Sequence, residues 1–265
     1  MFQDKVQVLW NRKIGPLYYK IGLGCGRGIA DADPGQFIML RLSGRIVPFL
    51  RRPFSIHRLI RNEDPTEGIE VLYRVVGECT QKLALLRPGD FVDVMGPLGK
   101  GFRIPDGVRR VFIAAGGIGV APLLFLAFSL RKKQIDPSGC RVFLGGKTKT
   151  DLLCGEDFRS LGMAIHPTTD DGSSGEMCFV THPLEAAVRK EPPEIIYACG
   201  PPGMLKCVVG IAEKFKVPCQ ISIESRMACG IGACLGCAVK GKELTEKYLH
   251  VCMDGPVFDA AAVEL

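Results

Sequence analysis

Four cysteines near the C-terminal end have a spacing that is typical of metal ligands. The pattern is Cys-x4-Cys-x2-Cys with a fourth cysteine after fourteen further residues, and it comprises Cys229, Cys234, Cys237 and Cys252. Plant-type [2Fe–2S] clusters are held by cysteines at this spacing. Glycines between the first three cysteines allow positive φ, so that backbone N–H groups can turn toward sulfur. The spacing therefore predicts a [2Fe–2S] centre.

Two other uses of these cysteines are weighed against the cluster. Zinc ribbons usually carry two separate Cys-x2-Cys pairs, and this segment has one. A Rieske centre needs two histidine ligands, and the loop has none. Buried thiols that act only as small apolar side chains are the remaining alternative. The chain has 12 cysteines and no apolar signal segment at its start, so we expect metal or redox chemistry rather than a disulfide framework.

A first nucleotide signal follows Arg51 and consists of Arg52, Pro53, Phe54 and Ser55. An arginine can bind a diphosphate with two hydrogen bonds, a serine hydroxyl can add another, and an aromatic ring can stack on a cofactor ring. Tyr73 and Arg74 supply similar groups on a later strand. From composition alone, a charged strand end is the alternative interpretation.

A second signal is the glycine-rich segment 116–122, which follows an apolar strand and opens a helix. Such a turn lets the backbone approach a pyrophosphate at the positive end of a helix. A second turn of this kind begins at Cys199, and together they should line one crevice; the candidate residues are Gly116, Gly117, Ile118, Gly119, Cys199, Gly200 and Pro201. Cys199 could equally be a small buried residue. Gly22-x-Gly24-x-Gly26 precedes no helical pattern, and we interpret it as a turn.

The elements that must position these motifs fall into two kinds. Before residue 107, alternating apolar residues predict strands over 1–10, 37–42, 69–76 and 91–95, with a short helix over 81–86. Short strands between Gly/Pro turns favour a small antiparallel barrel. After residue 107, strands over 111–114, 141–144, 195–198 and 219–224 alternate with helices over 122–133, 184–190 and 204–215. That alternation predicts a parallel α/β sheet.

Composition excludes several classes of protein. The 265 residues carry a net charge of +6 without a long basic run, so we expect no nucleic-acid partner. Residues 111–130 carry no charge, but Gly116, Gly117, Gly119 and Pro122 interrupt them, which argues against a membrane span. We therefore expect a cytoplasmic protein without membrane insertion.

The motifs together resemble the ferredoxin reductase family over nearly the whole chain. The matching segments are 52–55, 116–122, 169–175 and 199–203. The resemblance implies an N-terminal antiparallel Greek-key β-barrel that binds FAD (1–104), a Rossmann-like parallel α/β domain that binds NAD (105–218) and a short [2Fe–2S] segment (219–265).

The C-terminal segments 224–237 and 251–258 are similar to the family of electron-transfer subunits of NAD-linked dihydroorotate dehydrogenase. This resemblance implies that electrons pass from the FMN of a catalytic subunit through [2Fe–2S] and FAD to NAD⁺, in a heterotetramer with two copies of each subunit that serves pyrimidine biosynthesis. It also assigns Leu72, Cys79 and Thr80, beside residues 52–55 and 73–74, to FAD. Cys79 and Cys178 stand where relatives usually have glycine, and a thiol at position 79 could crowd the flavin phosphate.

Alternatives remain at the sequence level. The chain could serve another NAD(P)-linked complex, such as a hydrogenase, a sulfide reductase or a transhydrogenase, or it could be a non-catalytic zinc-binding or regulatory module. Lys147 and Lys149 could meet the 2′-phosphate of NADP. The four histidines are scattered, and we assign no catalytic acid or base. Three apolar residues beside the cysteines could contact a partner or shield the cluster from water; they are Met227, Ile231 and Leu235.

Overall fold

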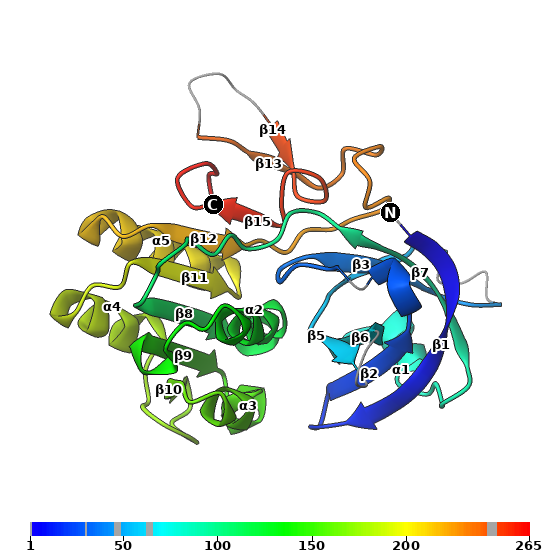
Figure 1. The fold of residues 1–265 in the computed structure, drawn as a ribbon, viewed down its shortest axis with the longest axis horizontal. Helices are drawn as coiled ribbons and strands as arrows, with labels where there is room; N and C mark the ends of the chain where they lie inside the picture. Colours follow the sequence, from blue (N-terminus) through cyan, green and yellow to red (C-terminus); the bar gives the residue numbers. More distant parts are fainter. Residues whose placement is uncertain (1, 30, 45–48, 62–65, 243–247) are drawn as a thin grey trace.

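The computed structural model describes residues 2–29, 31–44, 49–61, 66–242 and 248–265, and Met1 of the predicted first strand lies outside them. Two sheets lie side by side, and the C-terminal segment crosses above both of them (Figure 1). No helix in these ranges is long and apolar enough to cross a bilayer.

The N-terminal half forms a curled sheet of seven antiparallel strands in the order β4-β3-β7-β1-β2-β6-β5. The strands are β1 (Phe2–Lys13), β2 (Tyr18–Gly24), β3 (Phe37–Leu42), β4 (Arg52–Ser55), β5 (Arg58–Arg61), β6 (Thr66–Arg74) and β7 (Phe91–Leu98). Alternate residues such as Ile38 and Leu40 enter one apolar core because side chains along a strand point to opposite faces. The predicted antiparallel barrel architecture is confirmed.

The second sheet has six strands in the order β10-β9-β8-β11-β12-β15. The strands are β8 (Val111–Gly116), β9 (Cys140–Gly146), β10 (Ala164–Thr169), β11 (Ile195–Cys199), β12 (Cys219–Ser222) and β15 (Val257–Asp259). All of them are parallel except β15, which pairs antiparallel with β12. The predicted parallel α/β sheet is therefore confirmed. The predicted domain boundaries at 104/105 and 218/219 stay predictions. Strands β12 and β15, which follow the boundary at 218/219, complete this sheet.

Helices cover both faces of the parallel sheet (Figure 1). Helices α2 (Val120–Lys132) and α3 (Gly155–Ser160) lie on the face toward the barrel, and α4 (Thr181–Lys190) and α5 (Pro202–Phe215) lie on the other. Strand β8 packs on both layers because its residues alternate. Phe112 joins the core with α4 and α5, whereas Ile113 joins the core with α2.

The structure corrects the interpretation of the early glycines as a turn. Gly22 and Gly24 lie within β2, and only Gly26 begins a 3-10 turn, η1 (Gly26–Ile29). A Cβ at Gly22 would lie 2.5 Å from the Trp10 ring on β1, so the glycine makes room for tryptophan across the strand pair. Two elements also begin or end at residues other than those predicted. Helix α1 (Glu78–Leu83) begins three residues before the predicted helix, and β12 ends at Ser222 rather than at residue 224.

The C-terminal segment leaves the parallel sheet after β12 and returns to it as β15. Between them lie the cysteines and a small hairpin of β13 (Ala238–Lys240) and β14 (Tyr248–His250). Cys237 and Cys252 share an apolar core with Met39 and Leu98 of the barrel. The segment therefore packs on the barrel and on the α/β domain together.

Candidate cofactor sites and cysteine loop

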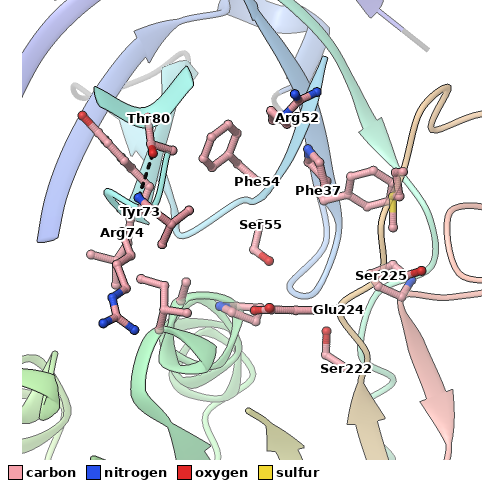
Figure 2. Close-up of a pocket in the computed structure, with 18 of the residues that line it drawn as sticks. Phe37, Arg52, Phe54, Ser55, Tyr73, Arg74, Thr80, Ser222, Glu224 and Ser225 are labelled. Atoms are coloured by element: carbon pink, nitrogen blue, oxygen red, sulfur yellow. Dashed lines mark hydrogen bonds between the residues drawn. The ribbon is translucent and has the colours of Figure 1, made fainter. Parts of the chain in front are cut away.

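A cavity of about 620 Å³ lies between the barrel and the parallel sheet (Figure 2). The structure brings onto its wall nine of the residues that the sequence assigned to FAD, namely Arg52, Pro53, Phe54, Ser55, Leu72, Tyr73, Arg74, Cys79 and Thr80. Their FAD contacts stay a prediction, because the structure shows placement only.

Neighbouring side chains hold the aromatic wall of this flavin cavity. Tyr73 is buried, stacks on Tyr19 with ring centroids 5.6 Å apart, and donates a 3.1 Å hydrogen bond to Asn11 Oδ1. Phe54 packs edge-on against Tyr73 at 6.1 Å. Both rings are held in place by protein contacts, and Phe54 faces the cavity (Figure 2). This wall suits a planar aromatic cofactor.

The adjacent side chains of Arg51 and Arg52 have different partners. The Arg51 guanidinium is held by Asp93, with Nη2 2.7 Å from Oδ1. Arg52 donates to the carbonyls of Leu50 and Arg51 and lines the cavity. Arg52 is thus the member of the pair that is placed to meet an anionic group in the cavity. Together with the aromatic wall, it fits the diphosphate and ring of a flavin dinucleotide.

The two cysteines at glycine positions do not strain the backbone. Cys79 lies in the short helix α1 and Cys178 in a loop, and neither has a positive φ. Burial raises the pKa of the Cys79 thiol. The next residue, Thr80, accepts hydrogen bonds from the backbone N–H groups of Val76 and Gly77 at 2.9 and 3.1 Å. A thiol at position 79 is therefore compatible with the local fold.

A second cavity, of about 660 Å³, opens at the carboxyl ends of the parallel strands. Six of the predicted nicotinamide-site residues line this nucleotide cavity, namely Gly116, Gly117, Ile118, Gly119, Gly200 and Pro201. A Cβ at Gly119 would lie 2.4 Å from the carbonyl oxygen of Cys199, so only glycine lets the two turns pack backbone to backbone. The turns meet in one crevice, which suits a dinucleotide at the strand ends.

The nucleotide cavity is also lined by residues that the sequence does not predict. They include Tyr18, Asp151, Thr168, Asp170 and Phe179, beside the expected Lys147. Lys149, the first residue of the 3-10 turn η4 (Lys149–Asp151), does not line the cavity. Asp170 directly follows β10, and that strand was not predicted. A strand assignment for 164–169 would have placed this carboxylate at the cavity.

Three residues line both cavities, namely Arg74, Ile118 and Glu224. Glu224 was also missed, because the predicted strand included it, whereas β12 ends two residues earlier. Its carboxylate is exposed within the cavities, and the protein atoms around it raise its pKa through partial desolvation. The two cavities therefore meet at a polar group from the chain between β12 and the cysteines. Figure 2 shows Glu224 beside the first of them.

Cys199 ends β11 and lines the flavin cavity rather than the nucleotide cavity. Burial is the main cause that raises the pKa of its thiol to about 12, and the nearby Glu224 raises it further. The Ser222 hydroxyl on the neighbouring strand is hydrogen-bonded to the thiol. Cys199 is therefore a protonated thiol at the point where the cavities meet.

The cysteine loop, residues 229–237, turns its backbone N–H groups toward sulfur. Cys229 Sγ accepts from the N–H groups of Ile231 and Cys234 at 3.5 and 3.4 Å, and Cys252 Sγ accepts from Gly232 at 3.2 Å. Burial raises the pKa of Cys229, but these backbone hydrogen bonds outweigh it and lower the pKa to about 7. Gly230 and Gly232 have positive φ, which this loop needs.

The four thiols do not gather around a single point. Cys237 and Cys252 lie with their sulfurs 3.3 Å apart, and Cys229 lies beside Cys234 through the backbone contact. Among the described residues, no three His, Cys, Asp or Glu side chains converge to hold a metal ion. Two pairs of thiols suit a two-iron cluster, in which each iron takes two protein ligands.

The apolar residues beside the cysteines have two different environments. Ile231, Leu235 and Met253 are 42%, 60% and 51% exposed, whereas Met227 lines the flavin cavity. Leu235 has a φ of 57°, which is uncommon for a residue with a branched side chain. We call Ile231, Leu235 and Met253 the apolar rim. Exposed apolar groups beside the cysteine thiols mark a surface that a partner could cover.

Comparisons with known proteins agree with this geometry. Residues 224–264 match the model of the iron-sulfur cluster binding domain of dihydroorotate dehydrogenase B, and residues 112–210 match an oxidoreductase NAD-binding domain. A dihydroorotate dehydrogenase B (NAD(+)) electron transfer subunit from Caldanaerobacter subterraneus is 42% identical over 98% of this chain and 97% of its own. The subunit of the same name from Bacillus caldolyticus is 39% identical over 99% of both chains.

Solved structures share the fold. A chain of the NADH-dependent reduced ferredoxin-NADP oxidoreductase, described for flavin-based electron bifurcation, has a TM-score of 0.83 and 27% identity, covering 98% of this chain and 89% of that chain. A ferredoxin NADP⁺ reductase from Neisseria gonorrhoeae with bound FAD and NADP has a TM-score of 0.67 and 15% identity over 80% of this chain and 91% of its own. The second likeness concerns the fold alone.

Proposed function

The chain belongs to the family of electron transfer subunits of NAD(+)-dependent dihydroorotate dehydrogenase B, and on this basis we propose which of its residues bind each cofactor. It is an oxidoreductase subunit that uses FAD, an iron–sulfur cluster and NAD. The main observation behind the proposal is that the flavin cavity adjoins both the nucleotide cavity and the cysteine loop. The flavin cavity shares Arg74, Ile118 and Glu224 with the nucleotide cavity, and its wall continues through Met227 toward the cysteine loop.

The order of the cofactors follows from their chemistry. A flavin, when bound, exchanges electron pairs with a nicotinamide and single electrons with an iron–sulfur cluster, so it stands between the two. In this chain, Arg52 would hold the flavin diphosphate, and Phe54 and Tyr73 would form the wall beside the ring. The two glycine turns at 116–119 and 200–201 would hold the dinucleotide. Cys229, Cys234, Cys237 and Cys252 would hold the cluster.

The oxidation of dihydroorotate itself belongs to a catalytic partner subunit. The known relatives are named electron transfer subunits, which implies such a partner. We propose that the partner carries FMN, that two copies of each subunit assemble, and that the apolar rim around the cysteine loop faces it. Electrons must cross the surface near the cluster, and the rim is the apolar surface that lies there.

The fold alone does not select this partner. The oxidoreductase that shares the fold with a TM-score of 0.83 is named for ferredoxin and NADP, and it is 27% identical. The electron transfer subunits are 36–42% identical over nearly the full chain in most cases. The C-terminal match over 224–264 includes all four cysteines. These two observations favour the dihydroorotate-linked role over another complex of the same architecture.

The experiment that tests the proposal is an anaerobic titration of the purified chain with NADH, followed by visible absorption. We expect a flavin band and broad iron–sulfur absorption, and both should bleach as NADH is added. Bleaching of flavin without any iron–sulfur band, together with bound zinc, would contradict the cluster assignment. A colourless protein would contradict the oxidoreductase assignment.

A further inference from the structure

His57 is a fully buried histidine that joins the two domains. It follows β4 two residues after Ser55, which lines the flavin cavity. Its Nδ1 lies 2.8 Å from the carbonyl oxygen of Ala121, in the first turn of α2. A carbonyl only accepts hydrogen bonds, so the proton must be on Nδ1. A single side chain therefore connects the flavin strand with the helix that follows the glycine turn.

The other ring nitrogen of His57, Nε2, also has close neighbours. Nε2 lies 3.8 Å from Cys154 Sγ and 3.5 Å from Glu70 Oε1. Because Nε2 carries no proton in this tautomer, the Cys154 thiol is the donor to it, and the Glu70 carboxylate, which only accepts, forms no hydrogen bond with Nε2. Glu70 in turn lies 3.5 Å from Lys20 Nζ. The backbone N–H of His57 donates to the carbonyl of Glu70 at 2.9 Å, so the ring has little freedom to move.

The residue that His57 holds belongs to the cavity. Ala121 and Pro122 line the flavin cavity from the side of α2, and Ile118, one turn earlier, lines both cavities. Ser55 lines the flavin cavity from the side of the barrel. The hydrogen bond from His57 to Ala121 thus spans the two walls between which a flavin and a nicotinamide must meet.

We propose that His57 is a positioning residue that fixes the first turn of α2 against β4 and so sets the separation between the flavin wall and the nicotinamide-side turn. This inference rests on the proposed function of the two cavities. Hydride transfer depends steeply on the distance between the reacting atoms, so a small shift of α2 would slow it. The ring stays neutral at physiological pH, because burial, with the nearby charges of Lys20 and Arg58, lowers the pKa of His57 to about 3.

Three variants of the full chain, assembled with its catalytic subunit, test the proposal. His57→Asn places an amide nitrogen where Nδ1 stands and keeps the donor to Ala121. His57→Gln carries its amide one bond further, at the place of Nε2, and His57→Leu has no donor. We expect His57→Leu and His57→Gln to slow flavin reduction by NADH at least tenfold, with KM for NADH changed less than about twofold. The long-wavelength charge-transfer absorption of the NAD–flavin complex should weaken in parallel, and His57→Asn should restore both.

Reduction of the same variants by dithionite is the control, because it does not need the nicotinamide-side turn. We expect the dithionite rate, the FAD content and the iron content to stay as in the wild type. Wild-type rates and charge-transfer absorption in a folded His57→Gln or His57→Leu chain would overturn the proposal, as would equal losses in all three variants. If His57→Leu does not fold, the comparison of His57→Asn with His57→Gln tests the proposal instead. If wild-type flavin is not reduced by NADH at all, the proposed function fails instead.

Discussion

The phenol of Tyr18 donates a 2.5 Å hydrogen bond to Asp151 Oδ1, and this contact crosses from strand β2 of the barrel to the turn η4 of the α/β domain. Both residues line the nucleotide cavity, and the Arg74 guanidinium lies 5.7 Å from the centre of the Tyr18 ring. Burial, then the bond to Asp151, raises the pKa of Tyr18 to about 12, so the phenol remains a donor. The barrel thus contributes directly to the site that the α/β domain builds for the dinucleotide.

Removal of this phenol should weaken NADH binding. Tyr18→Phe would leave the Asp151 carboxylate without its side-chain donor, and its charge would then act on the phosphates of the dinucleotide. A hydrogen bond to a charged group is worth about 1.5–3 kcal/mol, so we expect the Kd of NADH to rise by about tenfold to 150-fold. Tyr19→Phe is the matched control, because Tyr19 stacks on Tyr73 and does not line the cavity. An unchanged Kd in Tyr18→Phe, measured by titration of the flavin spectrum, would contradict this role.

Replacement of a cluster ligand should remove iron and leave the flavin. In Cys252→Ser the pair formed with Cys237 is broken, and we expect loss of the broad iron–sulfur absorption and of acid-released iron and sulfide. FAD content should stay close to one per chain, because no ligand cysteine lines the flavin cavity. Cys178→Ser, away from the loop, is the control and should keep its iron. Full iron and sulfide content in Cys252→Ser would exclude that residue as a ligand.

The sequence predicted the motifs whose chemistry is local. The cysteine spacing and the glycine turns are read from a few consecutive residues; in the structure Cys237 lies beside Cys252 and the two glycine turns pack together, and the ligand roles stay predictions. It missed Tyr18, Asp151 and Glu224, which reach the cavities only through the packing of the two domains. A tyrosine in an alternating strand is normally a core residue, and nothing near it in the chain points to Asp151. Such contributions depend on contacts that no local pattern encodes.

The errors have similar physical causes. No helical pattern follows Gly22 and Gly24, which favours a turn in the sequence, but in the structure both lie in a strand and Gly22 makes room for Trp10 on the neighbouring strand. The sequence offers Lys147 and Lys149 equally, but of the two only Lys147 lines the cavity, and Lys149 begins the 3-10 turn η4. For Cys79 the sequence leaves open whether the thiol crowds a phosphate or fits with a negative φ, and the structure shows a helical backbone that needs no glycine there.

The apolar rim should control association with the catalytic subunit. Leu235→Glu places a charge on a side chain that is 60% exposed, and burial of that charge at an interface is costly. We expect the dissociation constant of the complex to rise at least about tenfold, while the cluster spectrum of the isolated chain stays unchanged. Leu85→Glu is a matched control, since Leu85 is 77% exposed and follows α1 on the barrel. Loss of the cluster with unchanged association would show that the rim shields the cluster instead.

Asp170 should favour NADH over NADPH. The nicotinamide must lie where the two cavities meet, so the adenosine end should lie in the outer part, beside Asp170 and Lys147. A carboxylate there repels a 2′-phosphate and can accept from a ribose hydroxyl. We expect Asp170→Asn to reduce the ratio of kcat/KM for NADH to that for NADPH about tenfold. Asp171→Asn is the control, because the Asp171 carboxylate accepts from Ser173 and does not line the cavity. Equal use of both dinucleotides by the wild type would contradict the assignment.

His57 should make the fold sensitive to mild acid. The pKa of His57 is about 3 in the folded chain against an ordinary value of 6.5, so the unfolded chain binds the additional proton between these values. The contribution of His57 to the free energy of unfolding is present above pH 6.5 and is lost as the pH falls toward 3. Between pH 7.5 and 5.5 the loss from this one group is about 1.4 kcal/mol.

The groups that face His57 are fixed by the fold. Lys20 on β2, Arg58 on β5, Glu70 on β6 and Cys154 before α3 surround the ring. They are all present in His57→Asn, so the difference between wild type and this variant isolates the histidine. Urea midpoints, followed by circular dichroism, should fall less between pH 7.5 and 5.5 in His57→Asn than in the wild type and in the exposed-site control His182→Asn. A wild-type midpoint that does not fall more than that of His57→Asn would show that the imidazole titrates as an ordinary histidine.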